Sequence, residues 1–428
     1  MMKLVSKLAL GAAIAIGMGA VAGQPALAQK KGKAEAAGEA KFTPKLSKEF
    51  RAAAGPLQKA IEAKDFAAAK AALPAAQTGA TEADDKFFLG QFKLQIGLGT
   101  SDRPLQKEAL NDILNSGSAG ATPDLGRFAF FAGQFAYQDK DFAGAIQRLT
   151  QARQAGYAPV TAQGLPSHDI ELLLAESHFR TNQTVEGLAV LDEAVKAEKA
   201  AGRKAPADWY SRASSVAYSA KMMDQVARWT RMQIVDYPTA ENWRSALVIY
   251  GDSQKMDDQT NLDLMRLMRA AGALAGERDY FEYALLADKV GLPGEADGVV
   301  KEGLAKGSFD KSSKAINEIG NLAASRVPED KKSLPAAERS AATAANGKIA
   351  LSTADAFFGY GEFAKAAELY RLAIQKGGVD ANVANLRLGM ALARAGQKDA
   401  ARQAFAQVAT GQRGEIAKFW TIWLDQQA

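Results

Sequence analysis

Side chains that could carry out chemistry are sparse in this sequence, and they lack the neighbours that the chemistry needs. His168 and His178 are ten residues apart, whereas a helical zinc site places its ligands at i and i+4. Ser308 and Lys311 form the S-x-x-K pattern of penicillin-binding enzymes, but no K-T-G accompanies it. Cysteine is absent, which excludes disulfides, thiolate metal sites and cysteine nucleophiles. We therefore predict no catalytic residue, no cofactor and no metal, and expect both histidines to cap or pack helices.

The net positive charge of the chain comes from its N-terminal residues. Of the 53 Lys and Arg residues, five lie within residues 1–33, a stretch without Asp or Glu. From Ala34 onwards, 48 basic side chains balance 48 acidic ones. A nucleic-acid-binding protein needs a surplus of Lys and Arg to neutralise phosphates. We therefore predict no nucleic-acid partner.

The N-terminal segment has the organisation of a secretory signal peptide. A basic start up to Lys7 precedes an apolar stretch at residues 8–21 and the small-residue site that ends at Ala28. About 14 apolar residues are too few to span a bilayer, which needs roughly 20. We predict a signal peptide at residues 1–28 and a flexible lead-in at residues 29–41. The protein is then exported, to the periplasm in a Gram-negative cell, without a lipid anchor and without a membrane span.

Beyond residue 41 the sequence has a helical pattern. Helix-favouring Ala, Leu, Gln, Lys and Glu dominate, and apolar residues recur at three- and four-residue spacing between Gly, Pro or Asp. No sustained alternation of β-branched residues predicts a strand. Phe363, Ala366 and Tyr370 fall on one helix face, and Gly361 interrupts the preceding helix. The pattern therefore predicts helix–turn–helix units.

Five of these units share one pattern of small and apolar residues, with successive steps of 3, 4, 5, 4 and 3 residues. Small residues allow the two helices to approach closely, the third position falls in the turn, where Gly tolerates a positive φ, and the larger fifth residue fills the gap. The five matches are Gly133, Ala136, Lys140, Ala145, Leu149, Ala152; Ala175, His178, Asn182, Gly187, Leu191, Ala194; Ala284, Ala287, Gly291, Ala296, Val300, Gly303; Ala354, Phe357, Gly361, Ala366, Tyr370, Ala373; and Gly389, Leu392, Gly396, Ala401, Phe405, Val408.

This pattern resembles the tetratricopeptide repeat, a helix pair of about 34 residues, and the chain resembles uncharacterised exported bacterial proteins of that family. Trp209 and Trp243, 34 residues apart, occupy the aromatic position of the family's first helix. The resemblance implies an all-α fold, a right-handed α-solenoid of about ten hairpins over residues 42–410. One degenerate unit is expected around residues 319–346. Residues 411–428 are expected to form a C-terminal capping helix.

In proteins of this family the first helix of each pair lines a concave groove that holds a peptide or another protein. The resemblance therefore implies an exported protein–protein interaction scaffold with a protein or peptide partner. Aromatic residues together with Arg are good anchors for an extended peptide. The residues expected to face the groove are Arg127, Phe130, Gln134, Tyr137, Tyr210, Arg244, Arg278, Phe281, Leu351 and Phe358.

Two other functions are open alternatives. The protein could be a component of envelope polysaccharide or cell-wall machinery that binds glycan or a synthase subunit within a cell-envelope complex, with Tyr137 and Phe281 stacking on sugars. It could also be a glycan-cleaving enzyme with two carboxylates on a helical scaffold, for which two facing acids of raised pKa would be the sign. No pair of carboxylates stands out in the sequence, so we predict no enzymatic activity.

Overall fold

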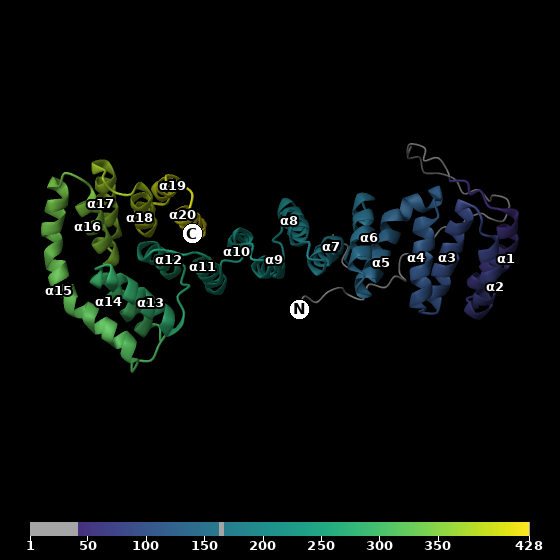
Figure 1. The fold of residues 1–428 in the computed structure, drawn as a ribbon, viewed down its shortest axis with the longest axis horizontal. Helices are drawn as coiled ribbons and strands as arrows, with labels where there is room; N and C mark the ends of the chain where they lie inside the picture. Colours follow the sequence, from purple (N-terminus) through teal and green to yellow (C-terminus); the bar gives the residue numbers. More distant parts are fainter. Residues whose placement is uncertain (1–41, 162–166, 428) are drawn as a thin grey trace, which may run out of the picture. The chain divides into compact units, whose positions relative to one another are not determined.

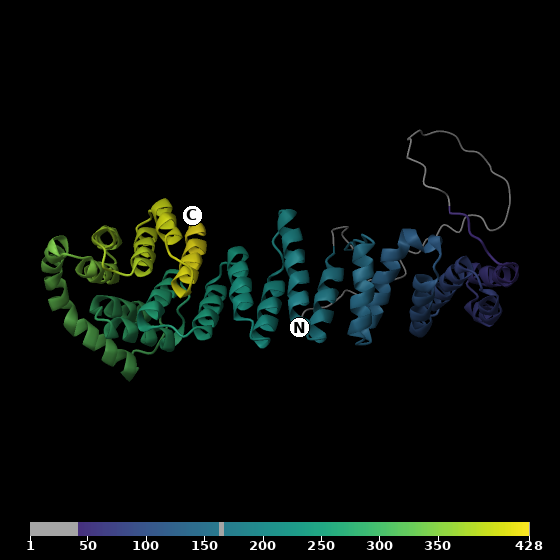
Figure 2. The same cartoon turned by 45° about the horizontal axis from the view of Figure 1, so that its top comes forward.

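The structure is a computed structural model that describes residues 42–161 and 167–427, and the predicted signal peptide and lead-in lie outside the described residues. The described residues form twenty α-helices and a short 3-10 helix, so the predicted all-α class is confirmed (Figures 1 and 2). The helices divide into two compact units, which meet in sequence at Ala205 and Pro206. Within the described residues no helix combines the length and apolarity needed to cross a membrane.

Unit 1 consists of four consecutive helix hairpins. Each first helix packs against the helix that follows it, and α3, whose residues 87–97 are almost all buried, lies at the centre of this packing. The helices are α1 (Lys48–Glu62), α2 (Phe66–Gly79), α3 (Ala83–Gly99), α4 (Arg103–Asn115), α5 (Leu125–Gln138), α6 (Phe142–Gln154), α7 (Asp169–Arg180) and α8 (Thr184–Ala200), with the 3-10 helix η2 (Ala119–Asp124) before α5.

Unit 2 contains the remaining twelve helices. Its first elements are hairpins like those of unit 1, and its last helices pack back onto the early ones, as described below. The helices are α9 (Ala207–Ser219), α10 (Met223–Asp236), α11 (Ala240–Ser253), α12 (Asp258–Ala270), α13 (Gly276–Lys289), α14 (Pro293–Ala305), α15 (Lys314–Thr343), α16 (Lys348–Gly359), α17 (Phe363–Lys376), α18 (Ala381–Arg394), α19 (Lys398–Ala406) and α20 (Gln412–Asp425).

The hairpin turns confirm the predicted backbone conformation. The third residue of every sequence match has a positive φ: 64° at Lys140, 59° at Asn182, 80° at Gly291, 80° at Gly361 and 77° at Gly396. A residue in this left-handed conformation after the last helical turn closes the hairpin. The periodic pattern therefore located the turns correctly, including the two where a side chain other than Gly occupies this conformation.

In the first three hairpins of unit 1 an aspartate after the turn starts the second helix. The side chains of Asp65, Asp102 and Asp141 each accept a hydrogen bond, at 2.9–3.1 Å, from the backbone N–H three residues further on. Such a cap satisfies a backbone donor that has no partner inside the helix and stabilises the helix by about 1 kcal/mol. The turn residue and the cap together explain why consecutive helices reverse direction at these positions.

The small residues bring paired helices together as predicted. A Cβ on Gly133 would lie 2.7 Å from Cγ of Leu149, and a Cβ on Gly389 would lie 2.4 Å from the ring of Phe405. Both contacts are shorter than van der Waals packing allows, so only glycine fits these crossings. In both pairs the small residue comes from the first helix and the large residue from the second, as the pattern of steps requires.

The prediction of a degenerate helix pair around residues 319–346 is wrong. This stretch belongs to α15, a single helix of 30 residues that packs against α13, α14 and α16. Its buried residues are few and widely spaced, and no Gly with a positive φ interrupts it. The turn signal that ends the other helices is therefore missing, and the helix continues.

Unit 2 closes on itself through its last helices. Helix α20 packs against α10 and α12 as well as against its sequence neighbours α18 and α19 (Figures 1 and 2). Tyr250 donates a hydrogen bond to the backbone oxygen of Gln412 at 3.0 Å, and Trp423 donates one to the backbone oxygen of Ala270 at 3.0 Å. These partners are more than 150 residues apart in sequence. Phe419, Trp420 and Leu424 of α20 are buried in the common core.

Candidate partner-binding pockets and a buried ion cluster

The centre of unit 2 holds a cluster of buried charges. Arg387 of α18 donates to Asp263 of α12 at 2.9 Å and to Asp355 of α16 at 2.7 Å. Arg266 of α12 donates to both carboxylate oxygens of Glu295 of α14, at 2.9 and 2.7 Å. The cluster thus connects four helices by charge-assisted hydrogen bonds, the strong class of such bonds.

Two buried tyrosines complete this cluster. Tyr283 donates to Glu295 at 2.7 Å, and Tyr370 donates to Asp355 at 2.6 Å. Burial alone would raise the pKa of the Glu295 carboxyl, but the attraction of Arg266 outweighs it and the pKa is lowered. The cluster is therefore a set of satisfied ion pairs in the core, in which Glu295 stays ionised.

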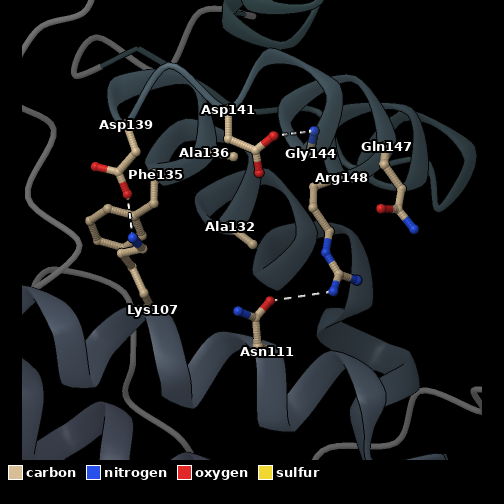
Figure 3. A pocket seen from close by; sticks show the side chains of 10 residues that line it. All are labelled: Lys107, Asn111, Ala132, Phe135, Ala136, Asp139, Asp141, Gly144, Gln147 and Arg148. Atoms are coloured by element: carbon tan, nitrogen blue, oxygen red, sulfur yellow. Dashed lines mark hydrogen bonds and ion pairs between the residues drawn. The ribbon is translucent and has the colours of Figure 1, made fainter.

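An open pocket of about 280 Å³ lies in unit 1, between the second helix of one hairpin and the next hairpin. Figure 3 shows Arg148 of α6 and Asn111 of α4 approaching each other across it. The floor is apolar, with Ala132, Phe135 and Ala136 of α5. The remaining lining residues are Lys107, Asp139, Asp141, Gly144 and Gln147.

Arg148 is the unusual residue of this pocket. It is half-buried, and burial lowers the pKa of its guanidinium. Its hydrogen bonds go to three neutral amide oxygens at long distances: Gln151 at 3.2 Å, Asn111 at 3.3 Å and Asn115 at 3.4 Å. By contrast, the nearby Lys107 pairs with Asp139. Within the described residues Arg148 therefore has no carboxylate partner.

Three of the predicted groove residues lie in the core, so their assignment to a surface is corrected. Tyr210 is 0% exposed and donates its hydroxyl to Asp236, Phe130 is 4% exposed, and Phe358 is 7% exposed. Burial of an aromatic ring removes a large apolar area from water, and in these hairpins the neighbouring helices provide that cover. For Phe358 the cover includes the guanidinium of Arg266, 4.8 Å from the ring centroid.

Two predicted residues do come together at one cavity. Arg244 of α11 and Arg278 of α13 line a pocket of about 200 Å³ with Leu264, Met265 and Met268 of α12. Both cations already have partners: Arg244 pairs with Asp279 at 2.9 Å and Arg278 with Glu282 at 2.8 Å. Arg278 is 84% exposed at its side chain. Partner binding by either residue stays a prediction.

The other five predicted residues are partly buried, and partner binding by them also stays a prediction. Phe281 and Leu351 pack against the core of unit 2. Arg127 pairs with Asp124 at 3.1 Å, and the ring of Tyr137 meets that of Phe142 edge-on at 5.6 Å. The five residues are Arg127, Gln134, Tyr137, Phe281 and Leu351.

On α5 the open pocket lies opposite the predicted groove face. Successive residues of a helix are rotated by about 100°. The pocket residues at positions 132, 135, 136 and 139 therefore lie on the other side of α5 from positions 127, 130, 134 and 137. Sequence reasoning missed Arg148 because it considered only first helices, whereas Arg148 lies on the second helix of its hairpin.

The two histidines have structural partners. His168 hydrogen-bonds to Glu198 at 2.6 Å, and His178 to Gln183 at 2.6 Å. His168 directly precedes α7, although its side chain does not cap that helix. In residues 42–161 and 167–427 no group of three or more His, Asp or Glu side chains is arranged to hold a metal ion.

Comparison with solved structures finds similarity, at low TM-scores, to proteins with helical repeats. The chain is similar to the TPR2AB domain of yeast Sti1, solved as a pHSP90 complex (14% identity, 71% of this chain and 100% of that chain covered, TM-score 0.24). It is also similar to the TPR domain of P58(IPK) (11%, 88% and 98%, 0.23) and to the apo form of RapI (13%, 76% and 97%, 0.20). The predicted helix hairpins are confirmed by the structure itself. No protein-family model and no curated protein matches the chain.

Proposed function

We propose that this protein is an exported, non-enzymatic interaction scaffold that binds an extended segment of a partner protein, and that Arg148 receives a carboxylate of that segment. One observation carries the proposal: a half-buried guanidinium faces an open pocket and has only long bonds to neutral amides. A carboxylate would replace these with charge-assisted bonds of about 2.7–2.9 Å in a bidentate geometry.

The rest of the pocket suits a peptide side chain. Ala132, Phe135 and Ala136 offer an apolar floor for the aliphatic part of a Glu or Asp residue. The carboxylate of Asp139 is occupied by Arg103 and Lys107, so it repels an incoming acid less than a free carboxylate would. The Asp141 carboxylate also lines the pocket and accepts a hydrogen bond from the backbone N–H of Gly144. An acidic residue is therefore favoured at Arg148, with apolar neighbours in the bound segment.

A binding role also agrees with the state of the buried carboxylates. A glycan-cleaving enzyme needs a carboxyl of raised pKa as general acid. The pKa of Glu295 is instead lowered, because Arg266 outweighs the effect of burial. This direction favours a structural role for the carboxylates in the core of unit 2.

The test is a selection of binding peptides. Purified protein starting at Gln29 is screened against a random peptide library, and selected peptides are measured by fluorescence polarisation. We expect acidic peptides to be enriched and Arg148→Gln to weaken them about tenfold or more. Arg153→Gln is the matched control, because Arg153 lies on the same helix outside the pocket and pairs with Glu193. Peptides that bind Arg148→Gln as tightly as the wild type would remove the proposed site.

The same protein tests the glycan alternative. Binding on a glycan array that is lost in Tyr137→Ala or Phe281→Ala would replace the peptide proposal by the envelope-polysaccharide one. Export to the periplasm is part of the proposal and rests on the signal-like order of residues 1–28.

A further inference from the structure

A second cavity, of about 350 Å³, lies within unit 2 beside the buried ion cluster. Its walls come from α12, α13, α14, α16, α17 and α18, so it is built from helices that only the closed form of unit 2 brings together. Its volume is in the range of small-molecule sites. The lining residues are Arg266, Arg269, Tyr283, Gly294, Asp297, Gly298, Phe358, Gly359, Tyr360, Gly361, Phe363 and Arg394.

One arginine of the cavity lacks a carboxylate partner within the described residues. This residue is Arg394, whose guanidinium lies 4.7 Å from the centroid of the Phe363 ring. Arg269, by contrast, pairs with Glu302 at 2.7 Å. The surrounding protein and then the like charge of Arg269 lower the pKa of Arg394. An anion beside Arg394 would stabilise its charged form.

The remaining walls are largely apolar. Tyr360 and Phe363 contribute aromatic rings, and Gly294, Gly298 and Gly361 contribute bare backbone. The Tyr360 ring lies against Gly294, and the guanidinium of Arg394 lies over the Phe363 ring, so these walls offer apolar contact beside the cation of Arg394.

Two other polar side chains that line the cavity, Tyr360 and Asp297, already have partners. The hydroxyl of Tyr360 is bound to Asp330 at 2.6 Å. The Asp297 carboxylate also lines the cavity, and Lys301 neutralises it at 2.7 Å.

We propose that this cavity binds a small organic anion, with its apolar body inside the cavity and one carboxylate or phosphate-ester group on the guanidinium of Arg394. The site lies wholly within unit 2 and does not depend on the peptide pocket of unit 1. The acidic side chain proposed for unit 1 and the small molecule proposed for unit 2 each carry one anionic group on an apolar body.

The structure offers a variant that fills the cavity without disturbing the core. A Cβ on Gly298 would meet only the Nη2 atom of Arg269, at 3.8 Å, which is ordinary contact. Gly298→Leu therefore occupies the space of the apolar body. Arg394→Gln removes the unpaired charge from an exposed side chain. Arg371→Gln, on the exposed face of α17, is the matched control.

The experiment measures binding of benzoate and phenyl phosphate to the protein by isothermal titration calorimetry. Benzyl alcohol is the control that lacks the negative charge, and inorganic phosphate is the control that lacks the apolar group. We expect both aromatic anions to bind and both comparison compounds to bind at least tenfold more weakly. Arg394→Gln should weaken the anions about tenfold to a hundredfold, Gly298→Leu should abolish binding, and Arg371→Gln should change nothing.

Two results would overturn the proposal. One is no binding of either aromatic anion to the wild type. The other is binding that Arg394→Gln and Gly298→Leu both leave unchanged while tryptophan fluorescence shows that each variant is folded. Because the peptide selection addresses unit 1, its outcome is independent of this one.

Discussion

Replacement of Arg387 by methionine tests whether the stability of unit 2 depends on the junction between its early and late helices. The Arg387 guanidinium is bonded to Asp263, 124 residues away in sequence, and to Asp355. Arg387 is 3% exposed and Asp263 0%. Methionine preserves most of the side-chain volume and removes the cation. Asp263 keeps Arg266 at 3.2 Å, and Asp355 keeps the hydroxyl of Tyr370 at 2.6 Å. Breaking a buried ion pair by removing one partner costs about 3–5 kcal/mol, so with these partners retained we expect a loss of about 3 kcal/mol in the free energy of unfolding.

The tryptophans make the measurement specific to unit 2. All five, from Trp209 to Trp423, belong to this unit. Urea unfolding followed by tryptophan fluorescence therefore reports unit 2, while far-UV circular dichroism follows the helices of both units. Since the free energy falls by about 1–3 kcal/mol per molar urea, the Arg387→Met midpoint should fall by about 1–3 M.

Two further variants test whether the loss of stability comes from the carboxylates that lose Arg387 as a partner. Arg387→Met combined with Asp263→Asn removes the charge of one of these two carboxylates and should recover part of the loss. Arg371→Met, an exposed arginine of the same unit, should change stability by less than about 0.5 kcal/mol. A midpoint for Arg387→Met as close to the wild type as that of Arg371→Met would refute the reasoning.

Three other predictions follow, two from the structure and one from the sequence. Lys140→Gly should stabilise unit 1 by about 1 kcal/mol in urea unfolding followed by circular dichroism, because Lys140 has a φ of 64°, whereas Lys140→Ala should bring no gain. A hydrogen bond from Arg203, and then one from His168, lowers the pKa of Glu198 to about 2. The stability that this carboxylate contributes is present above its ordinary pKa of 4.5 and lost as the pH falls towards 2. The protection of the α8 amides against hydrogen exchange, taken as the observed rate relative to the intrinsic rate at the same pH, should therefore fall over this pH range in the wild type and not in Glu198→Gln. Mass spectrometry of the periplasmic fraction should find a mature N-terminus at Gln29, and a chain that keeps residues 1–28 would contradict the predicted cleavage.

Local features of this fold could be predicted from the sequence. The turn positions at Lys140 and Asn182 were found from spacing alone, although neither residue is the glycine that the turn prefers. The spacing works because close helix crossings and hairpin reversals depend on residues that are near in sequence. The aromatic residues were harder to place. Phe130 and Tyr210 fit the groove face by position, yet each is covered by a neighbouring helix that the pattern does not specify.

The closure of unit 2 could not be predicted in this way. The closure depends on the rotation between successive hairpins, added over many hairpins. A pattern of a few residues within one hairpin does not determine this total rotation. One signal is present in the sequence: the second helix after Trp243 is not among the five matches to the repeat pattern. In the structure this helix is α12, in which every residue from Leu262 to Met268 is buried, Asp263 and Arg266 included. Opposite charges three residues apart inside an apolar run are a sign of a helix enclosed on all sides.

The long-range junctions of unit 2 have a consequence for how the chain acquires its structure. An open helical repeat consists of local contacts, so it can form from any point and spread to its neighbours. In unit 2, α10 and α12 pack against α20, which comes far later in the sequence. Contacts of such high sequence separation slow folding and keep apolar surface open in the meantime. Helices α10 to α12 therefore need protection, by a chaperone or by delayed folding, until α20 packs against them.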